Sequence, residues 1–364
     1  IAVSVDGEQH WSSFDVAEYR KPEWSVEVRF DRDRYIAGDA LESEVSAVYY
    51  FGSPVQDAQV DYRVYRQRTG FLGDLGASAA GGFRHEYYGY YQGQELYWQE
   101  FVTSGTARTD SSGKVHLSFK APLSSYGDGN YVYMLVADVT DSTGKVASGS
   151  GSVLVAGGTF DAQVVADRWI VSPNQEFSVK VLTVTSDGSP ASRQLALDVL
   201  RRRWHKDGYT DTPVSRMDVS TSARGEAAVG VTVPEAGEYI ILASGTDERG
   251  NRVEASTWIW ASSREGGVRS ERSDMVLVVD RERYSIGDTA RVVVSGPSEL
   301  ESVLVTVEDR ELRFAQVVPM RDGSASIDVE IKPEYAPNTW VSATAVSDGV
   351  MQTASREIAV DDPD

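Results

Sequence analysis

Cysteine is absent from this chain of 364 residues, and histidine is scarce. The lack of cysteine excludes disulfides, a thiolate nucleophile, cysteine-ligated zinc and a thioester within the chain. It leaves the compartment open, because many exported bacterial proteins also lack cysteine. The histidines show no spacing typical of metal ligands, so we expect no metal site. They are His10, His85, His116 and His205.

An excess of basic residues is also missing. The formal net charge is −20 and the pI is about 4.6. A surface this acidic repels phosphates, so we expect neither nucleic acid nor anionic lipid as a partner. No apolar run reaches the roughly 18 residues that a membrane-spanning helix needs, so we expect no membrane insertion in this segment.

Sequence signatures of catalysis are equally hard to find. No Gly-x-Ser-x-Gly elbow follows a parallel strand, and no glycine-rich phosphate loop is present. A Ser-His-Asp triad stays open, because its members need not be adjacent in sequence. Paired carboxylates carry no information in a chain with 55 acidic residues. We therefore predict no catalytic residue, no cofactor site and no enzymatic activity.

Strand patterns, in contrast, occur along the whole chain. Alternation with a period of two is common, as in residues 59–66, where Val60, Tyr62 and Val64 share one face. Other stretches are apolar on both faces, which suits strands that are covered on both sides or lie at a contact between modules. They are 131–137, 239–243 and 303–307. The pattern predicts an all-β chain.

Asp-x-x-Gly strings separate several of these strands. They are "DSSGK" (110–114), "DSTGK" (141–145) and "DERGN" (247–251). Such strings are typical of hairpin turns, in which the aspartate accepts hydrogen bonds from the turn backbone. A calcium loop is the alternative, but each string offers too few oxygen ligands for one. We favour hairpin turns.

One phrase occurs three times, as "DRDRYIAGD" (31–39), "DRWIVSPNQ" (167–175) and "DRERYSIGD" (280–288). Aligning the copies places Val171 with two tyrosines and Asn174 with two glycines. Glycine and asparagine tolerate a positive φ better than other residues. We predict that the first set is buried and that the second set turns the chain. The two sets are Tyr35, Val171 and Tyr284, and Gly38, Asn174 and Gly287.

The repeats predict three tandem modules of one fold. Each copy is followed by a proline, an irregular loop and an aromatic that opens a strand, namely Tyr131, Tyr239 or Trp340. We expect antiparallel β-sandwiches of the immunoglobulin or fibronectin III type, with about seven strands each. The predicted ranges are 24–157, 158–263 and 274–364, with a linker at 264–273. Residues 1–23 should form the end of a preceding module and an inter-module joint.

The first module carries an insertion, predicted at 67–107, that is rich in glycine and tyrosine. A long connection in a compact domain is usually functional or disordered. Its aromatic cluster is either an interaction surface or a cover for the sandwich. The cluster comprises Tyr87, Tyr88, Tyr90, Tyr91, Tyr97 and Trp98. Trp258 and Trp260 share one strand face, and we expect them to pack into a contact between modules.

Three further strings resemble segments of a known family. "FDVAEYRKPEW" (14–24) resembles the joint between successive macroglobulin-like domains of the alpha-2-macroglobulin family. "YYFGSPVQDAQVDYRVYR" (49–66) resembles the strand pair that follows such a joint, and "YAPNTWVSATAV" (335–346) resembles a strand of a later domain. Since the animal members are disulfide-bonded in these domains, the bacterial branch fits best.

The resemblance implies a function as well as a macroglobulin-like fold. Members are broad endopeptidase inhibitors that trap a protease through a conformational change after it cuts a bait segment. The implied partners are target endopeptidases, the remaining domains of the same chain and cell-wall synthesis proteins. The implied location is periplasmic, extracellular or at the cell envelope, with a lipoprotein anchor in an upstream segment. Without cysteine, this segment has no thioester, and we identify no bait segment in it.

Two other functions stay open on the sequence alone. The aromatic-rich insertion would also suit a glycan-binding or adhesive surface protein built of sandwich modules. A hydrolase with ancillary sandwich domains is a third reading, in which the catalytic domain lies outside this chain.

Overall fold

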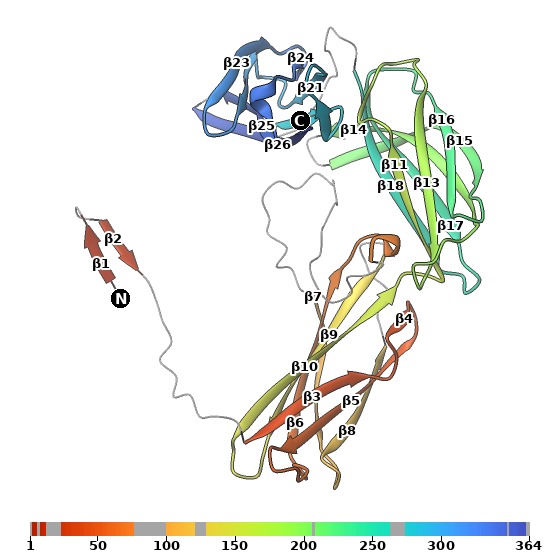
Figure 1. Ribbon diagram of the computed structural model, residues 1–364, viewed down its shortest axis with the longest axis vertical. Coiled ribbons are helices and arrows are strands. Elements are labelled where there is room, and N and C mark those ends of the chain that lie inside the picture. The colour runs from red at the N-terminus through yellow and green to blue at the C-terminus, as the bar shows by residue number, and fades with distance from the viewer. Residues whose placement is uncertain are drawn as a thin grey trace.

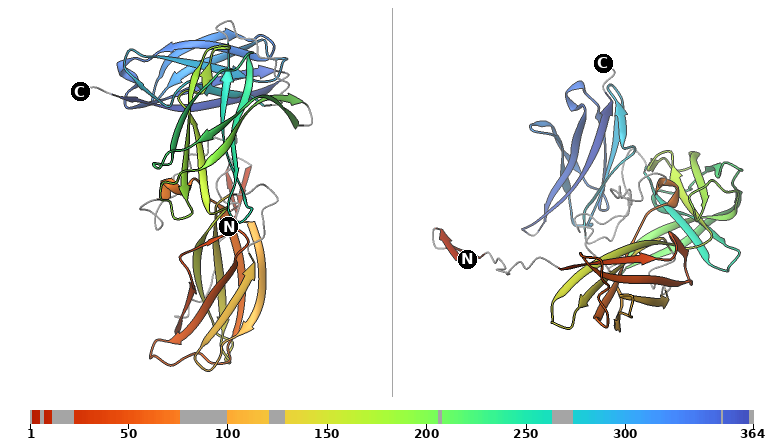
Figure 2. Two further views of the ribbon diagram at one scale, coloured as in Figure 1. Left: turned by 90° about the vertical axis from the view of Figure 1, so that its right-hand side faces the viewer. Right: turned by 60° about the horizontal axis from the view of Figure 1, so that its bottom comes forward.

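The computed structural model describes residues 2–5, 8–11, 23–75, 100–120, 129–205, 208–262, 274–347 and 349–361. It contains three β-sandwich modules, which we name module 1 (24–157), module 2 (158–262) and module 3 (274–361). The modules follow one another along a curve, with modules 1 and 3 at its ends (Figures 1 and 2). A separate hairpin precedes them, formed by β1 (Ala2–Val5) and β2 (Glu8–Trp11).

Module 1 consists of a three-stranded and a five-stranded sheet packed face to face. Its strands are β3 (Trp24–Phe30), β4 (Arg34–Ile36), β5 (Ala40–Tyr49), β6 (Gln59–Arg68), β7 (Glu100–Arg108), β8 (Lys114–Lys120), β9 (Tyr131–Thr140) and β10 (Val146–Ala156). The sheet orders are β3-β5-β8 and β4-β10-β9-β6-β7. A short 3-10 helix, η1 (Leu72–Leu75), follows β6.

Module 2 repeats this arrangement. Its strands are β11 (Phe160–Ala166), β12 (Ile170–Val171), β13 (Phe177–Thr185), β14 (Gln194–His205), β15 (Gly208–Ser220), β16 (Glu226–Val231), β17 (Gly237–Thr246) and β18 (Arg252–Ala261). The sheet orders are β11-β13-β16 and β12-β18-β17-β14-β15.

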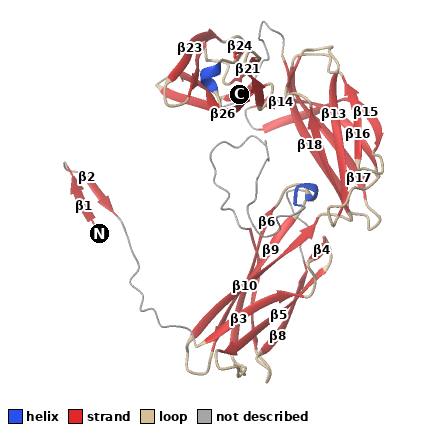
Figure 3. Cartoon of the chain, in the orientation of Figure 1, coloured by secondary structure: helices blue, strands red, loops and turns tan. Residues whose placement is uncertain are grey.

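Module 3 has the same topology again. Its strands are β19 (Val276–Val279), β20 (Arg283–Ser285), β21 (Thr289–Ser295), β22 (Ser302–Glu308), β23 (Leu312–Pro319), β24 (Ser324–Glu330), β25 (Asn338–Ser347) and β26 (Val350–Asp361). The sheet orders are β19-β21-β24 and β20-β26-β25-β22-β23. A 3-10 turn, η2 (Pro333–Tyr335), precedes β25. Apart from η1 and η2, the described residues contain strands and loops (Figure 3).

The predicted all-β fold of tandem sandwiches is therefore confirmed, with one addition. Each module has a short extra strand, β4, β12 or β20, which pairs in parallel with the last strand of the module. This strand lies within the repeated phrase and has only two or three residues, too few to show a period in the sequence. No helix among the described residues is long and apolar enough to cross a membrane.

Strand register makes the three modules comparable residue by residue. Tyr35, Val171 and Tyr284 pair with Val155, Ala261 and Val360 in the last strand of their modules. From there, antiparallel pairing fixes the counterpart of each residue in the neighbouring strands. Two residues are called counterparts below when they occupy the same register position in different modules.

Both predictions made from the repeated phrase are confirmed. Tyr35, Val171 and Tyr284 are at most 3% exposed and belong to the cores of their modules. Three residues after each of them, the chain turns through a positive φ. The angle is +91° at Gly38, +62° at Asn174 and +89° at Gly287.

The strand-opening aromatics are less equivalent than the sequence suggests. The counterparts of Tyr131 are Gly237 and Pro337, whereas Tyr239 matches Tyr133 in module 1. Trp340 lies on the outer face of β25 and is 44% exposed, while Tyr239 is fully buried. Trp340 therefore does not replace the core tyrosine of the other modules.

The Asp-x-x-Gly strings form hairpin turns, as predicted. In the turn after β9, Asp141 Oδ1 accepts hydrogen bonds from the backbone N–H groups of Thr143 and Lys145. Asp110 makes the same contacts with Ser112 and Lys114, and these hydrogen bonds, led by that of the Ser112 hydroxyl, lower the pKa of its carboxyl group. The carboxylates are thus used by the turn itself.

The alternating patterns place the core between the two sheets of each module. Strand β9 shows this most clearly, because every second residue from Tyr131 to Val139 is buried and those between are half-buried. Each module has its own large apolar cluster of this kind. Two smaller clusters lie between modules, and they lead to the joints described next.

Candidate functional site at the module joints

The aromatic residues predicted as an interaction surface, Tyr87, Tyr88, Tyr90, Tyr91, Tyr97 and Trp98, lie outside the described residues. Strand β6 ends at Arg68 and β7 begins at Glu100, so the connection that holds them joins neighbouring strands of the five-stranded sheet. The predicted insertion 67–107 includes the end of β6 and nearly all of β7. The residues where this connection leaves and re-enters the sheet are described. We call them the neck, and they are residues 66–68 at the end of β6 and Glu100 at the start of β7.

The neck is closed by a buried arginine. Arg66, at the end of β6, makes two hydrogen bonds to Glu100 at the start of β7, at 2.8 and 2.7 Å. A third hydrogen bond, of 3.2 Å, reaches the hydroxyl of Tyr133, and the guanidinium carbon lies 4.7 Å from the ring centroid of Tyr131. The hydrogen bonds from Arg66 lower the pKa of Glu100. An ion pair thus joins the two ends of the connection.

After the neck, the chain passes into the contact between modules 1 and 2, which we call joint 1–2. The side chain of Leu72, in η1, is 2% exposed and packs with Ala156 at the end of β10 and Val184 of β13. Phe71 and Leu154 complete this small apolar cluster. The first residues of the connection therefore belong to the joint.

Asn130 is the polar centre of joint 1–2. Its Nδ2 atom donates to the carbonyl of Gly70 over 3.1 Å and to Oδ2 of Asp161 over 2.7 Å. Its Oδ1 atom accepts the N–H of Gly157 over 3.0 Å. One buried side chain thus connects the neck region, the link between the modules and the first strand of module 2.

Asp161 receives these bonds from the side of module 2. Its Oδ2 atom also accepts the backbone N–H of Leu72 over 2.9 Å. Burial raises the pKa of the Asp161 carboxyl group, although the hydrogen bonds from Leu72 and Asn130 oppose the shift. A carboxyl group with a raised pKa therefore lies at the centre of a contact between two modules.

The repeated phrase of module 1 supplies a second set of contacts to joint 1–2. Asp39 accepts a hydrogen bond from Arg249 of module 2 over 2.8 Å and also one from its own turn, at the N–H of Ile36. Arg34 donates to the carbonyl of Ser186 in module 2. The turn that opens module 1 thus contacts two loops of the next module.

The chain crosses joint 1–2 through Gly157 and Gly158. A Cβ atom on Gly157 would lie 3.1 Å from the backbone of Gly129, and one on Gly158 would lie 2.9 Å from Val253. Side chains at these positions would force neighbouring atoms apart. The short link and its close packing leave the two modules little room to move independently.

The contact between modules 2 and 3, which we call joint 2–3, is mainly apolar. Ile170 of β12 and Trp260 of β18 are each 3% exposed and pack against Val293 of β21, which is 1% exposed. Val278 of β19 covers the same cluster. Trp260 and Val293 both point away from their own sandwich cores, so their burial arises from the neighbouring module.

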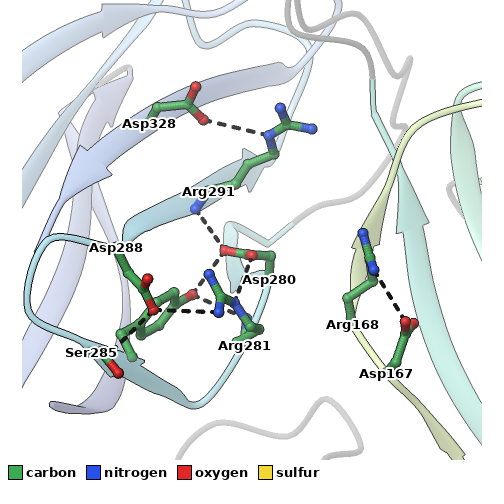
Figure 4. Close-up of polar contacts among 9 residues, drawn as sticks. Asp167, Arg168, Asp280, Arg281, Ser285, Asp288, Arg291 and Asp328 are labelled. Atoms are coloured by element: carbon green, nitrogen blue, oxygen red, sulfur yellow. Dashed lines mark hydrogen bonds and ion pairs between the residues drawn. The ribbon is translucent and has the colours of Figure 1, made fainter. Parts of the chain in front are cut away.

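Two backbone hydrogen bonds accompany this cluster. The N–H of Trp169 donates to the carbonyl of Asp280 over 3.0 Å, and the N–H of Trp260 donates to the carbonyl of Trp169 over 2.7 Å. The Asp280 side chain faces its own module, where it accepts the Tyr284 hydroxyl over 2.9 Å and the Arg291 N–H over 2.6 Å (Figure 4). Asp280 therefore fixes the start of module 3 and contacts module 2.

The expectation that Trp258 and Trp260 pack into a module contact holds for Trp260. The ring of Trp258 faces Arg202 of the same module, with the guanidinium carbon 4.6 Å from its centroid. Arg202 also lies 3.4 Å from the ring centroid of Tyr209 and makes two hydrogen bonds to Asp211. Only one of the two tryptophans thus lies in the apolar cluster of joint 2–3.

Both joints use the same end of the five-stranded sheet. Leu154, in joint 1–2, and Trp260, in joint 2–3, are counterparts, and so are Arg34 and Ile170. The counterparts in module 3 are Ala359 and Arg283. Sequence reasoning missed Asn130, Asp161 and Leu72, because nothing local marks a residue whose partners belong to another module.

The joints offer positioning and mechanical coupling. Among the described residues, no group of His, Cys, Asp and Glu side chains could hold a metal ion. What the geometry provides is two contacts of different chemistry. Joint 1–2 combines an apolar cluster with a buried polar network, and joint 2–3 is mainly apolar.

Comparison with known proteins gives these joints a family context. Residues 275–364 match the family model described as the alpha-2-macroglobulin bait region domain. The chain is 26% identical over 371 residues to an alpha-2-macroglobulin of Ralstonia nicotianae, which covers 98% of this chain and 21% of that protein. It is 28% identical over 357 residues to an alpha-2-macroglobulin of Thermotoga maritima, covering 95% and 19%. The chain is similar to bacterial alpha-2-macroglobulins along nearly its whole length.

The resemblance recognised in the sequence is therefore confirmed, and the family is one of non-enzymatic protease inhibitors. The chain spans about a fifth of the length of the curated relatives it matches. Among solved structures, trypsin-activated alpha-2-macroglobulin from Escherichia coli is similar, with a TM-score of 0.49 at 12% identity, covering 99% of this chain and 25% of that one.

Proposed function

We propose that this chain is part of the scaffold of a broad-spectrum endopeptidase inhibitor that traps proteases by a conformational change. Within that scaffold, joints 1–2 and 2–3 hold modules 1, 2 and 3 in one arrangement before cleavage and permit another after it. Target endopeptidases and the remaining domains of the full-length protein are the partners in this proposal.

The observation that carries the proposal is the sequence match to an alpha-2-macroglobulin along 98% of the chain. The structure agrees with a scaffold role, because the described contacts between modules are well packed. The glycan-binding alternative depends on aromatic residues outside the described part of the chain, so we propose the inhibitor function alone.

We also propose that the full-length protein works at the cell envelope, facing the periplasm or the exterior, where foreign endopeptidases would meet it. Cell fractionation with an antibody against this segment tests the location. Recovery in the cytoplasmic fraction would contradict it.

Trapping has a kinetic signature that tests the main proposal. The full-length protein is incubated with endopeptidases of different specificity, and activity is followed on a large protein and on a short peptide. A trapped protease loses activity on the protein but keeps it on the peptide, because only the small substrate reaches the enclosed active site. Loss of both activities would indicate active-site inhibition, and retention of both would refute an inhibitory function.

A joint variant connects this assay to the present chain. Trp260→Ala in the full-length protein should weaken trapping, because it removes apolar contact between modules 2 and 3. Trp258→Ala, on the same strand face, is the matched control. Equal trapping by both variants and the wild type would show that joint 2–3 has no part in the mechanism.

A further inference from the structure

The outer face of the five-stranded sheet in module 3 carries exposed apolar side chains on four neighbouring strands. Val317 of β23 pairs with Leu304 of β22, and Val346 of β25 pairs with Met351 of β26. Leu304 pairs in turn with Thr344, two residues before Val346. We call Leu304, Val317, Val346 and Met351 the outer patch. They are 38%, 64%, 66% and 67% exposed, respectively.

Modules 1 and 2 show that the fold does not require this patch. The counterparts of Val317 are Thr106 and Asp218, and those of Leu304 are Asp61 and Ala196. Threonines, Thr140 and Thr246, stand at the position of Val346. The position of Met351 is taken by Val146 in module 1 and Arg252 in module 2.

The same face carries ion pairs in the first two modules. In module 1, Arg63 pairs with Asp138, and in module 2, Arg216 pairs with Asp198 at 3.3 Å. The counterparts of Arg63 and Asp198 in module 3 are both Thr306, which carries no charge. The same topology therefore carries a charged outer face in modules 1 and 2 and an apolar outer face in module 3.

Contiguous exposed apolar surface is uncommon on soluble proteins and marks surfaces that are covered in an assembly. It is more unusual in a chain with a net charge of −20. Trp340 is 44% exposed on the same face of β25, but Ser342 and Thr344 separate it from Val346, so it lies outside the patch. Aromatic and aliphatic side chains of this kind provide most of the affinity of protein interfaces.

We propose that the outer patch packs against a further sandwich module of the same full-length protein, outside residues 1–364. The length of the relatives supports this occupant, because this chain matches only 21% and 19% of two of them. Joint 2–3 shows the mode of contact, since Val293 also lies on an outer sheet face and is buried by a neighbouring module, with Val278 partly buried beside it. The proposal rests on the similarity to these longer relatives and not on the trapping mechanism.

Cysteine labelling tests the proposal directly, because this segment has no cysteine of its own. Val317→Cys and Val346→Cys are introduced separately into the 364-residue chain and into the full-length protein. The rate of maleimide labelling at each site is then followed by peptide mass spectrometry. Thr106→Cys and Asp218→Cys are matched controls, since both replace exposed counterparts of Val317.

We expect labelling at 317 and 346 to be about tenfold or more slower in the full-length protein than in the 364-residue chain, with no such difference at 106 and 218. Equal rates in both contexts would overturn the proposal. If labelling of the 364-residue chain becomes slower as the protein concentration rises, the occupant is a second copy of the chain. Slowing only after an endopeptidase is added would identify the captured protease. Either of these results would overturn it as well.

A second variant keeps the test independent of labelling chemistry. Val317→Asp should lower the melting temperature of the full-length protein and leave that of the 364-residue chain unchanged, because the side chain is exposed in the latter. Thr106→Asp should change neither. A protein that does not trap proteases can still have an outer patch whose cysteines label slowly. The trapping proposal and the outer-patch proposal can therefore be refuted independently.

Discussion

Asn130 of module 1 donates a hydrogen bond of 2.7 Å to the carboxylate of Asp161 in module 2. Asn130 is 6% exposed, and its remaining amide hydrogen bonds go to Gly70 and Gly157. Two modules that could have been joined by a flexible tether are thus held by a shared buried polar group.

Replacing that asparagine should open the joint. Asn130→Ala removes these bonds and leaves the Gly157 N–H without its partner, at a cost of about 1–3 kcal/mol. A chain of several modules does not unfold in a single step, so amide hydrogen exchange at Leu72 and Gly157 is the suitable measurement. Asn338→Ala is the control, because Asn338 is exposed and its one described side-chain bond goes to Glu357. Unchanged exchange at both amides would contradict the role of Asn130.

The stability of joint 1–2 should depend on pH through Asp161. Its pKa is higher in the folded protein than its ordinary value of 3.8 because of burial, so the folded state binds this proton more tightly. The stabilisation is therefore complete at low pH and is lost as the pH rises from about 3.8 through the folded pKa.

Asp161→Asn, which stays neutral, should become more stable relative to the wild type over this interval. The comparison is made by amide hydrogen exchange at Leu72 across the pH range. Subtracting the wild type removes the opposite contribution of carboxylates with lowered pKa, such as Glu100 and Asp110. A difference that is the same at every pH would show that Asp161 has an ordinary pKa.

Truncating Trp260 should separate modules 2 and 3 and leave both folded. The loss of a buried tryptophan side chain typically costs about 3–5 kcal/mol. Here the loss falls on the contact, because Trp260 points away from the core of module 2. Hydrogen exchange in the strands of Val278 and Val293 should rise in Trp260→Ala, with less effect in Trp258→Ala. Cooperative unfolding of module 2 in Trp260→Ala would assign the residue to the core instead.

The turn glycine of module 3 should tolerate asparagine better than valine. Gly287 has a φ of +89°, and a Cβ atom there would meet no atom within 4 Å, so backbone strain alone sets the cost. Gly287→Val should lose about 1–2 kcal/mol. Gly287→Asn should lose less, since Asn174 occupies the equivalent turn of module 2 at +62°. Equal melting temperatures for the valine variant and the wild type would refute this account.

The ion pair between Arg66 and Glu100 at the neck should contribute more to stability than an exposed ion pair does. Glu100→Gln weakens the hydrogen bonds to Arg66, whose side chain is only 3% exposed, and should cost about 1–3 kcal/mol. Asp57→Asn breaks the pair with Arg108, in which both side chains are more than half exposed, and should cost under about 1 kcal/mol. Amide hydrogen exchange in β6 and β7 compares the two variants. A larger loss of stability in Asp57→Asn than in Glu100→Gln would contradict a stabilising role for the ion pair at the neck.

Local patterns in the sequence were sufficient for the fold. Alternation in the sequence predicts that every second residue of β9 lies in the core, as it does. Aligning the copies of the repeated phrase predicts that Tyr35, Val171 and Tyr284 share one buried position, and all three are buried. These features depend on neighbours along the chain or on a partner strand of the same module. They are therefore visible in a single sequence.

The joints could not be predicted in the same way. Leu72 lies 89 residues before Asp161, and their contact depends on the angle between two modules. Val293 and Trp260 point outward from their own sheets, so period-two reasoning alone would leave both exposed. Two tryptophans on one strand face predicted a module contact correctly for Trp260, but the sequence could not separate it from Trp258.

The chemical difference between the joints makes them respond differently to solution conditions. Apolar contact weakens on cooling, so the Trp260–Val293 contact should loosen in the cold more than the hydrogen-bonded network around Asn130. Added salt screens partly exposed ion pairs, and so it should weaken the Arg249–Asp39 contact without affecting the apolar one. Temperature and ionic strength should therefore act separately on the two joints of the same chain.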